Sequence, residues 1–325
     1  MEVLDLLNPK ALLIAALIFI PFERLTALRK DQKVLRKQWL NDAITFMVNK
    51  VLINVALIAT FGLFLGSLSG LVPEGATEFI LSQPLWLQVI EIIVISDTCY
   101  YLTHRAFHEV PVLWKFHSIH HSVEEMDWLA AYRIHPLDQT AAKIASLLPI
   151  FVLGFSGAAI LVYAFIFQWQ TLLIHSNTRL NFGPLRWILA SPQFHHWHHA
   201  NKPEAYNTNY AAQLPLIDLV FGTLHLPGRE LPDRYGVDDE IPAYYHQQFV
   251  YPFIRKSEDA PVLTEALMGE KVETGNGKTG KHGRSASPDR DLRILRNQGI
   301  PYSRADVDQP VAGRDLAAGC HHPGG

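Results

Sequence analysis

The chain has 325 residues, of which 49% are hydrophobic and 18% are charged, and its formal net charge is −3. This balance points neither to a basic nucleic-acid-binding surface nor to an acidic interaction tail, so no nucleic-acid partner is expected. The two cysteines, Cys99 and Cys320, are too few for a disulfide framework or for an iron–sulfur centre held by four thiolates.

Four stretches with almost no charge predict membrane-spanning helices. They are residues 11–22, 51–72, 84–95 and 144–167. A helix needs about 20 apolar residues to cross a hydrocarbon core of about 30 Å, and the second and third stretches approach this length with their flanking residues. For the first stretch the alternative is a buried core helix of a soluble protein. Because the N-terminus lacks the basic segment of a signal peptide, we expect this stretch to stay as an anchor.

The charges between these stretches predict the orientation in the membrane. Residues 23–37 contain six bases against Glu23 and Asp31, whereas residues 65–84 contain Glu74 and Glu78 and no base. Cytoplasmic loops of membrane proteins carry an excess of Lys and Arg. The first link is therefore predicted to be cytoplasmic, and the third span then returns to the cytoplasmic side.

The apolar segment 140–175 is long enough for two short helices, with a turn near Gly154, Ser156 and Gly157. One long tilted helix is the alternative, but it would place His195 on the opposite side of the membrane from His117. We therefore expect a hairpin.

The residues from Lys256 onward are rich in Gly, Ser, Asp, Lys and Arg and have few aromatic side chains. Such a composition cannot bury enough apolar surface to fold. The predicted organisation is an N-terminal transmembrane anchor region at 1–83, a histidine-box catalytic domain at 84–255 and a disordered C-terminal tail at 256–325.

Eleven histidines lie between residues 104 and 199, and eight of them form three boxes. The boxes are His104-x-x-x-His108, His117-x-x-His120-His121 and His195-x-x-His198-His199. On a helix, positions i, i+3 and i+4 share one face, so we expect each box to aim its imidazoles at one point. Imidazole is the commonest metal ligand in proteins. Eight ligands are too many for one ion but suit two ions with open positions, so the boxes predict a two-metal site.

Other residues are expected to support this site. His175 ends an apolar stretch and is predicted to face the cluster as a ninth ligand. The residues expected to make hydrogen bonds around the ligands are Asp97, His135, His196, Asn209 and Asp218. Asp97 lies two helical turns before His104, where it is expected to accept a hydrogen bond from the second ring nitrogen of a ligand. The alternatives are a capping or interfacial role for Asp97 and a purely structural role for His135.

The ligand types narrow the choice of metal. Structural zinc prefers four ligands in a closed tetrahedron, usually with Cys among them, which a histidine-rich set without thiolates does not resemble. Iron with imidazole ligands and vacant positions can reduce dioxygen and so allow attack on an unactivated C–H bond. We therefore expect two Fe ions, for which zinc can substitute in purified protein, with O2 as co-substrate. A site beneath apolar helices would admit a lipid sideways from the bilayer.

Residues 97–223 resemble the fatty acid hydroxylase and sterol desaturase superfamily of integral-membrane di-iron enzymes. The resemblance rests on Asp97-x-x-x-Tyr101-x-x-His104-Arg105-x-x-His108, Trp114-x-x-His117-x-x-His120-His121, Arg133-x-His135-Pro136, Phe194-His195-x-x-His198-His199, Asn209-Tyr210 and Asp218-x-x-Phe221-Gly222-Thr223. It implies iron ligation by the boxes and by a histidine like His175, a sterol, fatty acid or related lipid as substrate, and electrons from an external donor of the cytochrome b5, ferredoxin or reductase type. The chain departs from the family at Ala211, where glycine is frequent.

These observations together predict an all-α, multi-pass integral membrane protein with four to five apolar helices and a cytoplasmic helical cap that carries a histidine-rich dimetal site. The predicted function is an O2-dependent di-iron oxidoreductase that hydroxylates or desaturates a lipid C–H bond. The alternatives are a pterin-dependent ether-lipid monooxygenase and, in a different class, a histidine-rich membrane metal-binding or transport protein. The sequence leaves the substrate, the regiochemistry and the electron donor open.

Overall fold

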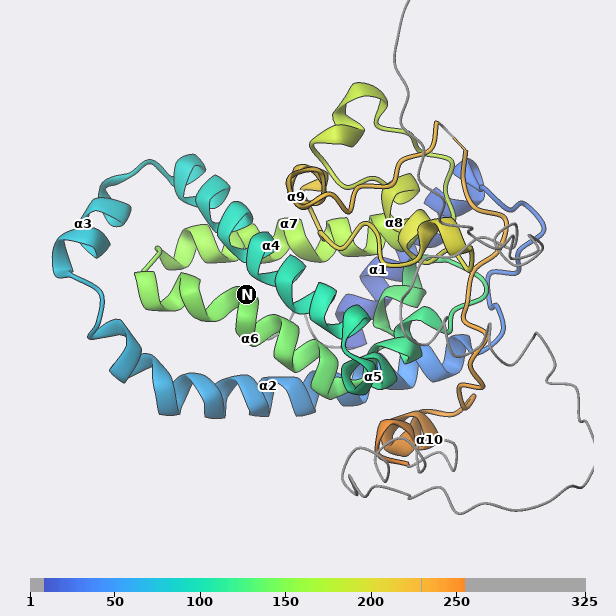
Figure 1. Ribbon diagram of the computed structural model, residues 1–325, viewed down its shortest axis with the longest axis horizontal. Helices are drawn as coiled ribbons and strands as arrows, with labels where there is room; N and C mark the ends of the chain where they lie inside the picture. The colour runs from blue at the N-terminus through green and yellow to red at the C-terminus, as the bar shows by residue number, and fades with distance from the viewer. Residues whose placement is uncertain (1–8, 229, 255–325) are drawn as a thin grey trace, which may run out of the picture. The chain divides into compact units, whose positions relative to one another are not determined.

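The computed structural model describes residues 9–228 and 230–254, which form helices joined by turns and loops (Figure 1). Within these ranges the extended pairing is limited to two isolated bridges, Ala27 with Thr178 and Ala200 with Tyr235. The predicted disordered tail lies outside the described residues. The all-α fold class is confirmed for the part of the chain that is described.

Ten α-helices follow one another along the described chain. They are α1 (Pro9–Thr26), α2 (Trp39–Ser69), α3 (Glu74–Ser82), α4 (Leu85–Glu109), α5 (Pro111–His121), α6 (Pro136–Leu153), α7 (Gly157–His175), α8 (Pro192–His198), α9 (Pro215–Phe221) and α10 (Tyr245–Val250). Short 3-10 helices include η2 (Trp128–Tyr132), which lies between α5 and α6. Three helices, α2, α4 and α7, are long and apolar enough to cross a membrane. The expectation of four to five spans stays a prediction, since α1 and α6 are not among these three.

Four helices, α2, α4, α6 and α7, run between the same two ends of the bundle (Figure 1). At one end lies α3, where the Thr77 hydroxyl donates to the carbonyl of Leu153 at 3.3 Å. At the other end α4 and α7 finish beside α5 and α8, which carry the remaining histidine boxes. The chain turns between α6 and α7 at residues 154–156, so the predicted hairpin is confirmed and the single long helix is wrong.

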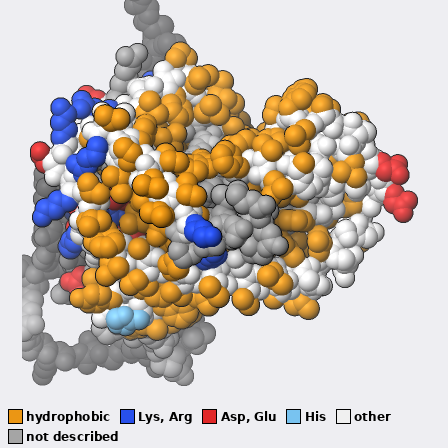
Figure 2. Space-filling model, turned by 180° about the vertical axis from the view of Figure 1, so that it is seen from behind, with side chains coloured by type: hydrophobic (Ala, Val, Ile, Leu, Met, Phe, Trp, Pro, Cys, Tyr) orange, Lys and Arg blue, Asp and Glu red, His pale blue; other side chains and the backbone are white. Residues whose placement is uncertain are grey.

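The core between these helices is apolar. Ile92 of α4, Ile150 of α6 and Tyr163 of α7 are buried in one cluster. Many outward side chains are apolar as well, for example Val55 of α2 and Phe165 of α7, which are 63% and 55% exposed. Hydrophobic side chains cover much of the face shown in Figure 2, and Lys and Arg gather toward one end of it. Large exposed apolar surfaces mark contact with a membrane or a partner, and here they lie on helices with the length of membrane spans.

The helix α1 packs beside the histidine end of the bundle. Its Phe19 stacks on Trp128 of η2 and on Trp169 of α7, with ring centroids 6.3 and 5.9 Å apart. The opposite side of α1 presents Leu13 and Leu17, which are exposed. A helix is thus present at the predicted anchor, and one side of it is fixed against η2 and α7, while its role as a membrane anchor stays a prediction.

Gly154 is the turn residue of the α6–α7 hairpin, and its φ of 75° lies in the left-handed region. A Cβ at this position would lie 2.6 Å from the Thr77 methyl carbon. A residue with a Cβ pays about 1–2 kcal/mol to adopt this left-handed backbone conformation. We therefore expect Gly154→Ala to lower the free energy of unfolding by at least about this amount, measured as a fall in Tm in detergent. Gly157→Ala is the matched control because a Cβ there meets nothing within 4 Å. Equal Tm values for the two variants would contradict this account of the turn.

Candidate metal centre

Four helices deliver histidines to one end of the bundle. The last turns of α4 carry His104 and His108, and α7 ends with His175. The last two turns of α5 and the whole of α8 with its C-cap carry the other two boxes. Segments that are up to 95 residues apart, from 104 to 199, therefore meet at one place. The convergence on which the sequence interpretation depended is present.

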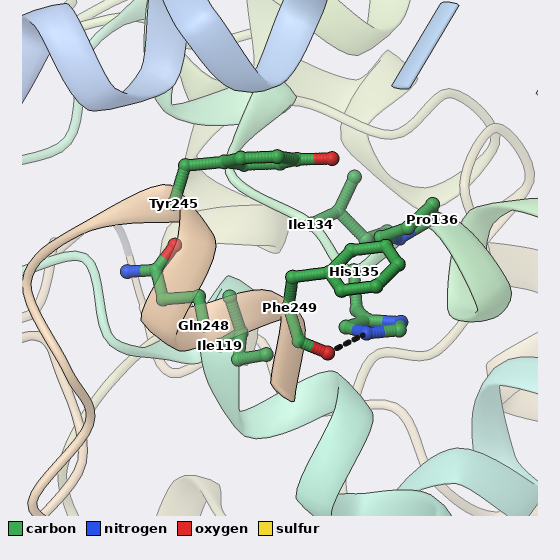
Figure 3. A pocket seen from close by; sticks show the side chains of 7 residues that line it. All are labelled: Ile119, Ile134, His135, Pro136, Tyr245, Gln248 and Phe249. Carbon is green, nitrogen blue, oxygen red and sulfur yellow. Dashed lines mark hydrogen bonds between the residues drawn. The ribbon is translucent and has the colours of Figure 1, made fainter. Parts of the chain in front are cut away.

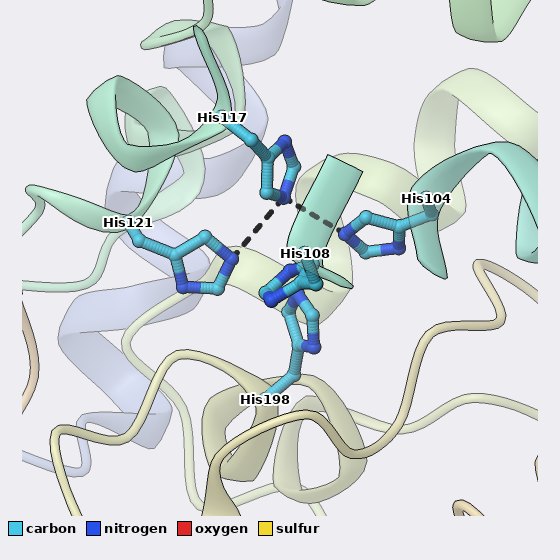
Figure 4. A group of neighbouring side chains, drawn as sticks. All are labelled: His104, His108, His117, His121 and His198. Carbon is cyan, nitrogen blue, oxygen red and sulfur yellow. Dashed lines mark hydrogen bonds between the residues drawn. The ribbon is translucent and has the colours of Figure 1, made fainter. Parts of the chain in front are cut away.

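The nine imidazoles divide into two groups, in each of which the candidate ligand atoms lie within 4.8 Å of one another. The five-histidine group contains His104, His108, His117, His121 and His198, and Figure 4 shows these rings facing a common centre. The four-histidine group contains His120, His175, His195 and His199. The structure thus brings together all nine residues predicted as ligands.

The expectation that each box aims at one point holds for His104 and His108 but is wrong for the other two boxes. The neighbours His120 and His121 belong to different groups, and so do His198 and His199. Successive side chains on a helix point about 100° apart, so two adjacent histidines cannot face the same centre. Each His-His pair instead lies between the two groups and places them side by side.

Burial holds four of the histidines outside the candidate spans in the neutral form. Burial, together with neighbouring histidines, keeps the pKa of His120, His121 and His199 well below the usual range. Burial likewise lowers the pKa of His198 to about 3. Only a neutral imidazole has a free lone pair for a metal, so the electrostatics of the site favour the ligating state.

Five of the nine rings turn their Nδ1 atoms outward to an oxygen. The acceptors are the Tyr210 carbonyl for His104 (2.6 Å), the Asp138 carboxylate for His117 (2.7 Å), the Arg133 carbonyl for His120 (3.0 Å), the Thr171 carbonyl for His175 (2.7 Å) and the Thr208 carbonyl for His198 (2.8 Å). A carbonyl or carboxylate can only accept, so each Nδ1 carries the ring proton. The Nε2 atom of each ring is then a bare lone pair that points into its group.

These bare nitrogens lie very close together. The Nε2 atoms of His104 and His117 are 2.9 Å apart, and those of His120 and His175 are 3.3 Å apart. Two lone pairs without a proton between them repel, so neither pair is a hydrogen bond. Metal–imidazole bonds of about 2.0–2.1 Å place adjacent ligand nitrogens about 3 Å apart. The spacing therefore fits a cation in each group, and the buried, unpartnered Nε2 atoms of His108 and His198 fit it as well.

The donor set indicates which ions suit the site. All nine candidate ligands are imidazoles, with no thiolate and no carboxylate in either group. Imidazole suits iron, copper and zinc, whereas calcium and magnesium prefer oxygen ligands. An octahedral ion would keep at least one open position in either group, which is where a small molecule such as dioxygen can bind.

Asp97 and Asp218 are buried near the site, but neither contacts a histidine ring. Asp97 accepts hydrogen bonds from the backbone N–H groups of residues 212, 213 and 214, at 2.8, 3.1 and 2.7 Å. Asp218 accepts from the N–H groups of Tyr210 and Ala211 at 2.7 and 2.9 Å. The predicted contact of Asp97 with a ligand is wrong, because seven residues along a helix correspond to about 10 Å. Both carboxylates instead fix the loop whose Tyr210 carbonyl orients His104.

The sequence interpretation missed Asp138. Its carboxylate, in the first turn of α6, is the only side-chain group among the five acceptors described above, and it bonds Nδ1 of His117. A carboxylate paired with a metal-bound histidine fixes the ring and raises its basicity. The available signal was its place two residues after the Arg133-x-His135-Pro136 segment and just before the predicted helical segment 140–175.

The remaining predicted residues lie outside both groups. His196 is buried, with the Tyr235 hydroxyl at 2.8 Å from Nδ1 and the Ser176 carbonyl at 3.1 Å from Nε2. Asn209 donates to the carbonyls of Phe194 and His225 at 2.9 and 2.8 Å, and so ties α8 to a following loop.

His135 has a structural role. Its Nδ1 accepts from the Leu137 N–H at the start of α6, and its Nε2 donates to the Phe249 carbonyl at 3.0 Å. Figure 3 shows this bond in the small pocket between α5, the start of α6 and α10. His135 thus secures the helix that carries Asp138.

Comparison with known proteins places these residues in a family context. The family described as fatty acid hydroxylase matches residues 89–223. An ornithine lipid hydroxylase, OlsE, from Rhizobium tropici is 34% identical over 174 residues, which cover 53% of this chain and 52% of that protein. The alkylglycerol monooxygenase of Xenopus tropicalis is 34% identical over 41% of this chain and 29% of its own length.

A more distant relative is the very-long-chain aldehyde decarbonylase GL1-7 of Oryza sativa subsp. japonica, which is 29% identical over 42% of this chain and 22% of its own length. The chain therefore spans about half or less of the relatives that it matches. No solved structure matches it.

Replacing Asp138 tests the role of the buried carboxylate. We expect Asp138→Asn to weaken metal binding by about 10–100-fold, the usual cost of removing such an acceptor, measured by equilibrium dialysis with Fe²⁺ under anaerobic conditions. Glu78→Gln, an exposed change in α3 at the other end of the bundle, is the control. Unchanged affinity in Asp138→Asn would show that the carboxylate does not act on His117.

Removing metal tests whether the close lone pairs need a cation. A ligand present at about 1,000 times its Kd adds about 4 kcal/mol to the free energy of unfolding. We therefore expect chelation to lower Tm and readdition of Fe²⁺ to restore it. A protein whose Tm is the same with and without metal would contradict the fit of a cation to these groups.

Proposed function

The chain belongs to the fatty acid hydroxylase superfamily, and on that premise we propose that it is a membrane oxidoreductase that uses dioxygen to oxidise a C–H bond of a lipid. The observation that carries this proposal is the pair of all-histidine groups at one end of the apolar helices. The proposed cofactor is two iron ions, one in each group. When bound, they would supply the electrons and the open positions needed to activate O2.

The residues of the chain prepare the site for this chemistry. The outward hydrogen bonds fix the tautomers of five of the nine rings before any ion binds, so that the ligand nitrogens of these five need no rearrangement. Except for His108, the nine rings are buried, which excludes bulk water from both groups. Exclusion of water protects a reactive oxidant from side reactions. These features support oxygenation more than simple metal storage.

A lipid substrate is supported by the position of the site. Two candidate spans, α4 and α7, supply ligands from their last turns, so the two groups lie where the apolar helices end. The names of the relatives specify an ornithine lipid, an alkylglycerol and a very-long-chain aldehyde. Their shared feature is a long apolar chain, and we propose that the substrate here has one as well. Electrons would come from an external protein donor on the cytoplasmic face, an orientation that the six bases of residues 24–37 support.

The second enzymatic candidate is a pterin-dependent ether-lipid monooxygenase, which the alkylglycerol monooxygenase match favours. That match covers a smaller share of this chain than the ornithine lipid hydroxylase match does. A metal transporter, by contrast, would need ligands along a path through the spans. Here the candidate ligands gather at one end of α4 and α7, which supports an enzyme.

A comparison of lipids tests the enzymatic proposal directly. Membranes that contain the wild-type protein, an iron source and a reductant should form an oxidised lipid under ¹⁸O2 and none under anaerobic conditions. Hydroxylation would place ¹⁸O in the product, whereas desaturation would remove two hydrogens without label. Dependence on added pterin would select the ether-lipid alternative.

The variant for this experiment is His120→Ala, which removes one ligand of the four-histidine group. We expect no detectable product from it, because the group would keep only three of its four imidazoles. His246→Ala changes an exposed histidine outside both groups and should leave the product unchanged. Equal product from His120→Ala and wild type, or product formed without O2, would sink the proposal.

A further inference from the structure

A cluster of buried charges lies outside both histidine groups. Arg133 makes two hydrogen bonds to the Asp42 carboxylate, at 2.6 and 3.0 Å. Arg36 bonds the same carboxylate at 2.6 Å and Asp127 at 2.8 Å. The four side chains are at most 6% exposed. The cluster joins the first turn of α2 to the residues on either side of η2.

Such a cluster is not explained by its contribution to stability. Removing two ions from water costs several kcal/mol each, and well-packed apolar residues in their place are often as stable or more so. A buried ion pair does, however, fix geometry, because a planar guanidinium that bonds a carboxylate twice has one favoured orientation. The cluster is therefore suited to hold backbone segments in place.

One of these segments reaches a histidine of the four-histidine group. The backbone carbonyl of Arg133, whose side chain is fixed by Asp42, accepts the Nδ1 proton of His120 at 3.0 Å. Asp127 also accepts a hydrogen bond from the Ala130 N–H at 2.9 Å, which caps η2 before Arg133. The orientation of the His120 ring thus depends on the Arg133 carbonyl. The charge cluster holds Arg133 directly through Asp42, and through Asp127 it holds the start of the η2 helix that precedes Arg133.

A second link leads toward His175. Glu23, at the end of α1, accepts hydrogen bonds from the N–H groups of Trp128 and Asn177 at 2.8 and 2.9 Å through a single oxygen. Trp128 follows Asp127 directly, and Asn177 lies two residues after His175. The end of α7 is therefore tied to the segment that the charge cluster holds.

We propose that Asp42, Arg36, Asp127 and Arg133 are positioning residues for the four-histidine group, and that this group binds its metal ion with full affinity only while the buried charge cluster is intact. Among the described residues, the hydrogen bonds of the cluster lead to His120 and to no histidine of the five-histidine group. That group is supported separately, by Asp138 and by the loop that Asp97 and Asp218 hold. The inference rests on the proposed two-metal function.

The test is the metal content of the purified full chain after anaerobic loading with Fe²⁺. Asp42→Asn keeps the size of the side chain and removes the charge. We expect wild type to bind two Fe²⁺ and Asp42→Asn to bind about one tightly, with the Kd of the other raised about 10–100-fold. Arg133→Lys keeps the charge but cannot bond the carboxylate twice, so it should shift the same Kd in the same direction by a smaller factor. Because Arg133→Lys is the milder change, it gives a result even where Asp42→Asn fails to fold.

Two controls show whether the loss is local. Glu109→Gln removes one charge from the partly exposed pair with Arg105 and should leave two Fe²⁺ bound. In a double-mutant cycle, Asp42→Asn should cause no further loss of Fe²⁺ affinity in a His120→Ala background, because both changes act on the same group. It should add to the loss of affinity caused by Asp138→Asn, because that change acts on the other group.

The positioning role would be overturned if Asp42→Asn and Arg133→Lys both bound two Fe²⁺ with wild-type affinity. An equal loss of both ions would overturn it too, since it would show general destabilisation. A wild-type protein that binds no transition metal would instead sink the proposed function on which the inference rests.

Discussion

Repulsion between bare imidazole nitrogens is the constraint that the rest of this structure must satisfy. The Nε2 atoms of His104 and His117 lie 2.9 Å apart, and those of His120 and His175 lie 3.3 Å apart. Neutral rings at these distances do not stay together by themselves, because their lone pairs point at one another. The surrounding protein must hold them in place, and a cation bound in each group would turn this repulsion into attraction.

The protein meets this constraint with two different supports. Around the five-histidine group, carboxylates bond either a ring directly, as Asp138 does, or the backbone amides of a loop, as Asp97 and Asp218 do. Beside the four-histidine group, a cluster of paired charges fixes the segment that contains the Arg133 carbonyl. The two groups share the His-His pairs of α5 and α8, but their outer supports are separate. The two proposed metal ions would therefore depend on different supports.

The place of the site in the bundle connects this chemistry to a membrane. The helices α4 and α7 are apolar along most of their length and become histidine-bearing only in their last turns. An apolar chain that lies among these helices would thus meet the histidine groups without passing through water. The same arrangement explains why the polar residues concentrate at one end, since unpaired polar groups within a hydrocarbon layer are costly.

The sequence by itself determined the features that depend on residues close to one another along the chain. Apolar composition predicted the long helices, and the glycine and serine at 154–156 predicted the hairpin turn. Box spacing predicted eight of the nine candidate ligands, and the end of an apolar stretch predicted His175. Only the tertiary structure decided which ligand belongs to which group, because His120 and His121 share a box and point to different centres. It also decided the partners of the rings, most of which are backbone carbonyls such as those of Tyr210 and Arg133. Every residue has a backbone carbonyl, so the sequence does not reveal which carbonyls accept a hydrogen bond from a histidine. Only the packing of distant segments brings a particular carbonyl to a histidine ring.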